Sequence, residues 1–104
     1  MAKTEYIVKD LDLKVPIIKE NVVITKIGDG SVVSPSYEDE SEPYIITLND
    51  TGTFIFFEID GIKTVKELVE KMISHYDIDY INAKEDLYEL VKDLEEGKII
   101  VWKE

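Results

Sequence analysis

Apolar residues in the C-terminal half of the chain recur every three or four positions, which is the spacing of an amphipathic helix. The first series predicts a helix that begins after Thr64 and ends near His75. Thr64 followed by Glu67 is a capping-box pattern, which satisfies free N–H groups at a helix start. The inward positions of this helix are Val65, Leu68, Val69, Met72 and Ile73.

A second series predicts a later helix whose remaining surface is charged. Asp79 or Asn82 can cap its start, and Gly97 ends it because glycine readily adopts the backbone conformation that terminates helices. Its inward positions are Ala83, Leu87, Leu90, Val91 and Leu94.

The segment before these helices is shorter and more apolar. Asn49 or Asp50 can cap a helix that runs to about Glu58, with Gly61 as its terminator. Residues 54–57 read Phe-Ile-Phe-Phe, so we expect this helix to be the most buried and to form a wedge between a sheet and the other helices. On this interpretation Phe57 lies in the core, and Phe57→Ala costs several kcal/mol.

The N-terminal part of the chain favours strands. Two β-branched runs, residues 22–27 and 31–33, flank Gly28-Asp29-Gly30, a strong hairpin signal because glycine and aspartate tolerate positive φ. Residues 44–48 predict a third strand, which follows an acidic segment (36–43) expected to be an exposed loop. A closing apolar run at residues 98–102 predicts a short strand or a docked tail.

Strands followed by helices predict an α+β fold. A length of 104 residues suits one domain, which we place at residues 15–104. Residues 1–14 show no clear period and are expected to form a loosely ordered arm.

Composition narrows the function classes. The chain has no Cys, which excludes disulfides and thiolate catalysis, and no apolar run of the roughly 18 residues needed to cross a membrane. Its start lacks the pattern of a signal peptide, so we expect a cytoplasmic protein. Formal net charge is -11, and every basic residue is Lys. Nucleic acid is therefore an unfavourable partner, whereas a basic peptide or protein would be attracted, although a large negative charge also serves solubility.

No group of residues predicts catalysis, a metal site or a cofactor. His75, the single histidine, lies at a predicted helix end, where an imidazole suits the helix dipole. The acidic pairs Asp77 with Asp79 and Glu85 with Asp86 lack the alternating ligands and central glycine of a calcium loop. We interpret them as helix caps and a solvated face.

Two features indicate binding instead. The third strand can lie at an open sheet edge, whose unpaired backbone groups would accept an added strand. On the last helix, Tyr80 and Tyr88 lie off the inward stripe. For Tyr88, packing at the core rim and contact with a ligand both remain open.

Residues 44–100 closely resemble the PqqD-like proteins, the peptide-binding chaperones or precursor peptide recognition elements of ribosomal peptide modification pathways. Order and spacing carry the resemblance more than any single motif, and the hairpin from about residue 22 matches more weakly. The matching pattern comprises Leu48-Asn49, Thr51-Gly52, the apolar-aromatic residues 54–57, Gly61, the TVKEL stretch at 64–68, the YDID turn at 76–79, and Glu85-Asp86. Phe56 or Phe57 stands where the family often has Trp.

The resemblance implies a winged helix-turn-helix-like fold, with three N-terminal antiparallel strands packed on three helices. It also implies that the leader segment of a precursor peptide adds as a strand to the third strand, beside the third helix. Leu87 and Val91 also belong to the inward stripe, so core packing and peptide contact both remain open for them. Carried over by position, the peptide-binding residues are Tyr44, Ile45, Ile46, Thr47, Leu48, Lys84, Leu87, Tyr88 and Val91.

The resemblance implies a non-catalytic module that presents a leader peptide to a modifying enzyme. A radical SAM enzyme is the commonest partner it implies, with a lasso-peptide protease or a cyclodehydratase as alternatives. A winged-helix DNA-binding regulator is the rival hypothesis, but its reader helix would carry mostly carboxylates, which repel phosphates. An open edge strand also permits a homodimer. A proline at Ile46 is expected to abolish peptide binding if the N–H of Ile46 faces the added strand.

Overall fold

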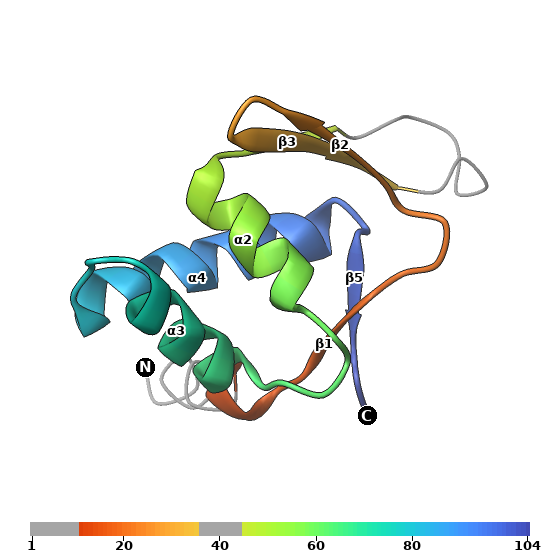
Figure 1. Cartoon of the computed structure of the whole chain (residues 1–104). Coiled ribbons are helices and arrows are strands. Elements are labelled where there is room, and N and C mark those ends of the chain that lie inside the picture. Colours follow the sequence, from red (N-terminus) through yellow and green to blue (C-terminus); the bar gives the residue numbers. More distant parts are fainter. Residues whose placement is uncertain (1–10, 36–44) are drawn as a thin grey trace.

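The computed structural model describes residues 11–35 and 45–104, so the acidic segment expected to form a loop lies outside the described residues. The helices and strands form an α+β fold of the winged helix-turn-helix kind, as predicted (Figure 1). No helix in the described ranges is long and apolar enough to cross a membrane. In chain order the elements are β1 (Pro16–Ile18), β2 (Val23–Ile27), β3 (Gly30–Ser34), β4 (Ile46–Leu48), α2 (Asp50–Glu58), α3 (Val65–His75), α4 (Tyr80–Glu96) and β5 (Ile100–Trp102).

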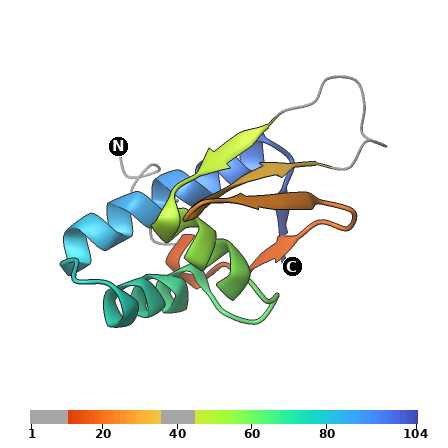
Figure 2. The same ribbon diagram turned by 45° about the horizontal axis from the view of Figure 1, so that its top comes forward.

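The three strands β2, β3 and β4 form one antiparallel sheet in that order (Figure 2). A two-residue turn joins β2 to β3, and Gly28 supplies the positive φ, +62°, that such a turn requires. Thr25 pairs with Val32, which pairs in turn with Thr47, so the ladder crosses all three strands. The hairpin prediction is confirmed, while the third predicted strand begins at Ile46.

Helix α2 lies between this sheet and α3, in contact with both (Figure 1). Asn49 caps its start, because the side-chain oxygen accepts a hydrogen bond of 2.8 Å from the Gly52 N–H. A buried hydrogen bond of 2.8 Å joins the hydroxyls of Ser31 and Thr53 and ties β3 to α2. Two buried hydroxyls that satisfy one another avoid the cost of an unpaired polar group.

Helices α3 and α4 pack against each other and complete the core. The capping box of Thr64 and Glu67 is present, as predicted, and α4 follows Asp79 and ends at Gly97. Leu90 is only partly buried, unlike the rest of the predicted inward stripe of α4. Side-chain caps thus mark the starts of α2 and α3 as predicted, whereas Asp79 makes no capping hydrogen bond at the start of α4 and Gly97 has a negative φ of -82°.

The strand β1 was not predicted. It pairs antiparallel with β5, the predicted closing strand, in a two-stranded ribbon (Figure 1). Backbone hydrogen bonds from Lys19 N to Ile99 O (2.8 Å) and from Lys103 N to Val15 O (2.9 Å) extend the ribbon at both ends. β1 has only three residues, one of which is a proline, and so short a segment shows no alternation of apolar and polar residues from which a strand could be predicted.

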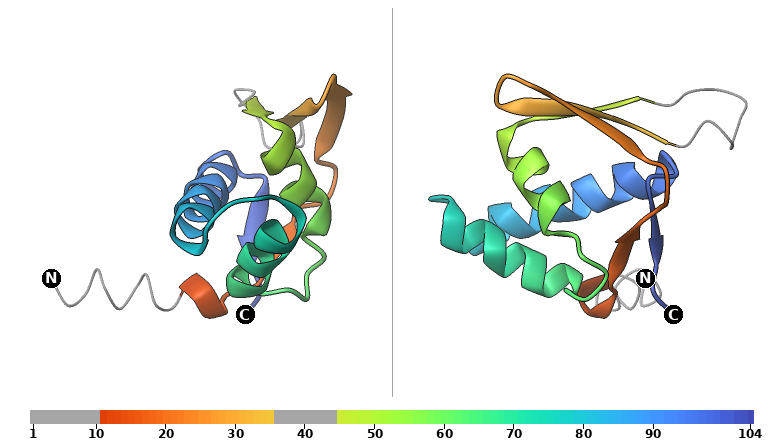
Figure 3. Two further views of the ribbon diagram at one scale, coloured as in Figure 1. Left: turned by 60° about the vertical axis from the view of Figure 1, so that its left-hand side comes forward. Right: turned by 45° about the vertical axis from the view of Figure 1, so that its right-hand side comes forward.

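Residues 11–14 do not form a loose arm. They contain a helical turn at residues 11–13 that lies close to α3 (Figure 3). Leu11 packs against the core, and the Lys14 carbonyl accepts a hydrogen bond of 2.9 Å from the Val65 N–H. The remainder of the predicted arm, residues 1–10, lies outside the described residues.

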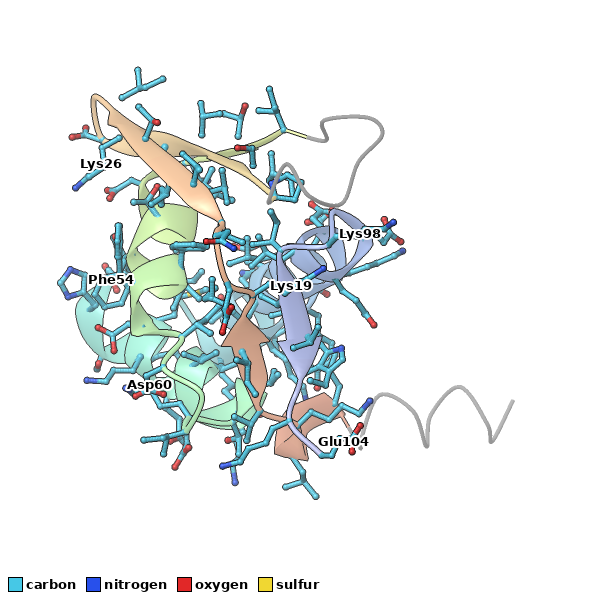
Figure 4. All side chains as sticks on the ribbon, turned by 90° about the vertical axis from the view of Figure 1, so that its right-hand side faces the viewer. Lys19, Lys26, Phe54, Asp60, Lys98 and Glu104 are labelled. Atoms are coloured by element: carbon cyan, nitrogen blue, oxygen red, sulfur yellow. The ribbon has the colours of Figure 1, made fainter. Side chains whose placement is uncertain are left out.

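The apolar run at residues 54–57 is divided between core and surface. Ile55 and Phe56 are buried, whereas Phe54 stacks on the His75 ring at the outer side of α2, with ring centroids 4.1 Å apart (Figure 4). Phe57 is 57% exposed, so its predicted core position was wrong. Consecutive helical residues point about 100° apart, so four in a row are all buried only when neighbours surround the helix. The described residues leave the Phe57 side of α2 open.

We therefore expect Phe56→Ala to lower the free energy of unfolding by about 3–5 kcal/mol, because it leaves a cavity in the core. Phe57→Ala, its matched control, should cost about 1 kcal/mol or less because this ring is mostly solvated. Urea denaturation of the two variants measures both values. Equal losses would contradict the assignment of Phe56 to the core and Phe57 to the surface.

Candidate functional site

A groove of about 430 Å³ lies between β4 and α4. Figure 2 shows β4 at the margin of the sheet, with α4 behind it. Four elements or their caps line the groove: Ile46, Thr47 and Leu48 from β4; Asn49, Thr51 and Gly52 from the start of α2; Met72 from α3; and Asp86, Glu89, Leu90 and Asp93 from α4.

One edge of β4 is open. Within the described part of the chain, β4 pairs with β3 and with no other strand. The carbonyl oxygen of Leu48 faces β3. A Cβ atom built on Gly30, the first residue of β3, would lie only 2.4 Å from this oxygen. Successive strand residues direct their N–H and C=O groups to opposite sides. Thr47 therefore presents both groups to the open edge, next to the groove.

This orientation bears on the substitution suggested by the sequence. Ile46 is two residues from Leu48, so its N–H and C=O face β3, where Ile46 pairs with Val33. A proline at Ile46 would remove an N–H that faces β3 and would not remove a donor from the open edge. Thr47 is the position whose N–H is available to an added strand.

The floor of the groove is apolar. Leu48 and Met72 are buried in the core, and Ile46 and Leu90 are partly exposed beside them. An extended chain laid along β4 would direct alternate side chains toward this floor. Burial of apolar side chains there would be favourable, at about 25 cal/mol for each Å² removed from water.

The α4 wall of the groove is acidic. Asp86, Glu89 and Asp93 are exposed, and none of the three forms an ion pair within residues 11–35 and 45–104. The residues that line the groove include no Lys. The groove therefore combines unpaired backbone polar groups, an apolar floor and a negatively charged wall.

Lys84 and Tyr88 lie on another flank of α4. Each is two residues from Asp86, a rotation of about 200° around a helix, and neither lines the groove. The Tyr88 hydroxyl donates a hydrogen bond to the Asp12 carboxylate, and Lys84 Nζ lies 3.4 Å from Asp12 Oδ2. Lys84 Nζ also lies over the Tyr88 ring, 5.5 Å from its centroid. These two predicted binding residues hold the segment before β1 against α4.

Burial is the main reason why the pKa of the Tyr88 phenol is well above its ordinary value. The hydrogen bond to Asp12 and the negative charge of that carboxylate raise the pKa further. Both effects oppose tyrosinate formation.

Three of the predicted strand residues line the groove: Ile46, Thr47 and Leu48. Ile45 precedes β4, is 58% exposed and does not line the groove. Leu87 and Val91 are buried in the core and do not line the groove. Tyr44 lies outside the described residues.

The sequence interpretation missed the α4 side of the groove. Asp86, Glu89, Leu90 and Asp93 recur at positions i, i+3, i+4 and i+7, so they share one helix face. That spacing was visible, but the carboxylates resembled an ordinary solvated surface, and Leu90 was assigned to the inward stripe. The sequence alone did not indicate that β4 lies opposite this face.

The described residues contain no group of three His, Asp or Glu side chains that could hold a metal ion. His75 stacks on Phe54 and meets the Tyr76 ring at 4.8 Å, and it is not among the groove residues.

The family model described as Coenzyme PQQ synthesis protein D (PqqD) matches residues 38–100, which include β4 and all of α2, α3 and α4. Among solved structures, the chain is similar to one described as TbiB1 in complex with the TbiA(beta) leader peptide. The two chains share 20% sequence identity at a TM-score of 0.64, over 80% of this chain and 92% of that chain, which shows a common fold. No curated protein matches the sequence.

The contact between Tyr88 and Asp12 predicts a specific pH dependence. Because the pKa of Tyr88 is raised in the folded state, the stabilising contribution of the neutral phenol is fully present below about pH 10, the unfolded-state pKa. It is lost as the pH rises through the higher folded-state pKa. In Asp12→Asn, one tyrosine should ionise at lower pH than in the wild type, because the carboxylate charge is removed while burial remains. Ultraviolet absorbance of tyrosinate against pH measures this shift, and superimposable titrations would contradict the contact.

Proposed function

The chain belongs to the PqqD family, and we propose that it binds the leader segment of a ribosomally made precursor peptide and presents it to a modifying enzyme. The observation that carries this proposal is the open edge of β4, where Thr47 presents its N–H and C=O groups beside a groove. Support also comes from the shared fold of TbiB1, a protein whose structure was determined with a leader peptide.

The leader would bind as a fourth strand of the sheet, next to β4. Its backbone would exchange hydrogen bonds with Thr47, and alternate side chains would enter the groove. Backbone bonds supply affinity that depends little on the peptide sequence, while the groove supplies selectivity. β4 is only three residues long, but the adjoining groove continues to the cap of α2 and would extend the contact with the added segment.

The protein itself would not catalyse the modification. The groove combines backbone groups, apolar side chains and carboxylates, with no paired nucleophile and base. Catalysis then belongs to a partner enzyme, for which a radical SAM enzyme is the first candidate and a lasso-peptide protease or a cyclodehydratase are alternatives. Ribosomal precursor peptides are made in the cytoplasm, so the proposal places the protein there.

A DNA-binding role has less support. A winged-helix reader would bring the exposed face of α4 to the phosphates, and that face carries Asp86, Glu89 and Asp93. Carboxylates at such an interface would oppose the electrostatic attraction on which DNA binding depends.

The test uses a displayed library of N-terminal segments from short reading frames of the same genome. We expect the wild-type protein to capture a small set of segments and to show NMR shifts concentrated on β4 and the groove side of α4. Thr47→Pro should abolish this binding, because proline removes the N–H at the open edge, a position where folded sheets tolerate proline. Thr47→Ala, which retains the N–H, should still bind.

Circular dichroism and NMR spectra of Thr47→Pro establish that the variant is folded. Binding retained by the folded proline variant would exclude strand addition at Thr47. NMR shifts on other surfaces, or tight and salt-sensitive DNA binding without peptide capture, would overturn the proposed function. A stable dimer that buries β4 would also overturn it, since the edge would already be paired.

A further inference from the structure

We infer that the groove selects a basic leader segment, with Lys or Arg side chains at alternating positions that face α4. This inference rests on the proposed function and specifies the chemistry of its ligand. The acidic wall, defined as Asp86, Glu89 and Asp93, would be the specificity-determining surface.

The acidic wall has a regular spacing along α4. At a rise of about 1.5 Å per residue, Glu89 and Asp93 are about 6 Å apart along the helix, and Asp86 extends the row to about 10 Å. On one face of a strand, side chains two residues apart are separated by about 6–7 Å, and side chains four residues apart by about 13 Å. Two basic residues separated by one position would therefore match Glu89 and Asp93, and a third would fall near the end of the row.

The surroundings of the wall favour cations. No lysine lines the groove, and none of the three carboxylates has an ion-pair partner in the described ranges. Lys and Arg can lay their aliphatic stems on apolar surface while their charged ends reach outward. Leu90, which is partly exposed and lines the groove beside the wall, supplies such an apolar surface.

An acidic leader would face the opposite situation. Its carboxylates would lie beside three carboxylates that have no ion-pair partner among the described residues, within a chain whose net charge is -11. Like charges that face each other across an interface weaken the binding of a wrong partner, whereas opposite charges favour the right one. The wall would thus discriminate between leaders that can all form the same backbone hydrogen bonds.

The inference concerns the position of the carboxylates and not the net charge of the chain. Helix α4 offers a control set of carboxylates that tests this distinction. Glu85, Glu95 and Glu96 are also exposed on this helix but do not line the groove. Replacing either set of three by the corresponding amides changes the net charge by the same amount. Only the groove set should change peptide selectivity.

The experiment uses a displayed library of randomised linear peptides, which favours no charge in advance. Against the wild-type protein, we expect enrichment of peptides with Lys or Arg at alternate positions and NMR shifts at the groove.

The triple variant Asp86→Asn, Glu89→Gln, Asp93→Asn should bind a selected basic peptide about tenfold more weakly, the sum expected for a few partly exposed ion pairs. The control Glu85→Gln, Glu95→Gln, Glu96→Gln should bind that peptide with nearly unchanged affinity. Added salt should weaken wild-type binding and have less effect on the groove variant.

The outcomes separate the inference from the proposed function. Peptides that bind the groove without basic enrichment would overturn the inference and leave the proposed function standing. Equal losses in both triple variants would also overturn it, since the effect would then come from net charge. If no peptide from either library binds at the groove, the proposed function fails and the inference fails with it.

Discussion

The antiparallel pairing of β4 with β3 is the constraint on which the groove depends. β4 is only three residues long, and it is held by β3 on one side and by the cap of α2 at its end. The buried hydrogen bond between Ser31 and Thr53 ties the partner strand to that same helix. Because the sheet and α2 are linked in this way, the open edge of β4 has a defined position opposite α4, with Thr47 directed outward.

An open sheet edge also carries a risk, since it can pair with the edge of another copy of the chain. Strong negative charge opposes that pairing, because two copies at net charge -11 repel one another. The acidic wall beside β4 places part of this charge where edge-to-edge contact would occur. On the proposed function the same carboxylates would serve two ends, by discouraging self-association and by attracting a basic leader.

Helix α4 has different neighbours on its two flanks. The buried face of α4 contributes to the core and separates the two flanks; it consists of Ala83, Leu87, Val91 and Leu94. One flank faces β4 across the groove, and the other carries Lys84 and Tyr88 in contact with Asp12. An aromatic residue off the core stripe therefore does not identify a ligand site by itself, because in this protein a segment more than seventy residues earlier covers it.

Local physical chemistry made the helices, their caps and the hairpin predictable from the sequence. Thr64 with Glu67, Asn49 before α2, Gly28 in its turn and the apolar stripes of α3 and α4 act through neighbours in the chain, so their signals are visible without a structure. Contacts between distant segments were decided only by the tertiary structure. Pairing of β1 with β5 joins the two ends of the described chain through strands of three residues, too short to show a period. Phe57 is solvated because none of the described elements covers its side of α2. The groove wall was recognisable only once the structure placed β4 opposite Asp86, Glu89 and Asp93. Spacing along a helix determines which side chains share a face, whereas packing of remote elements determines what that face meets.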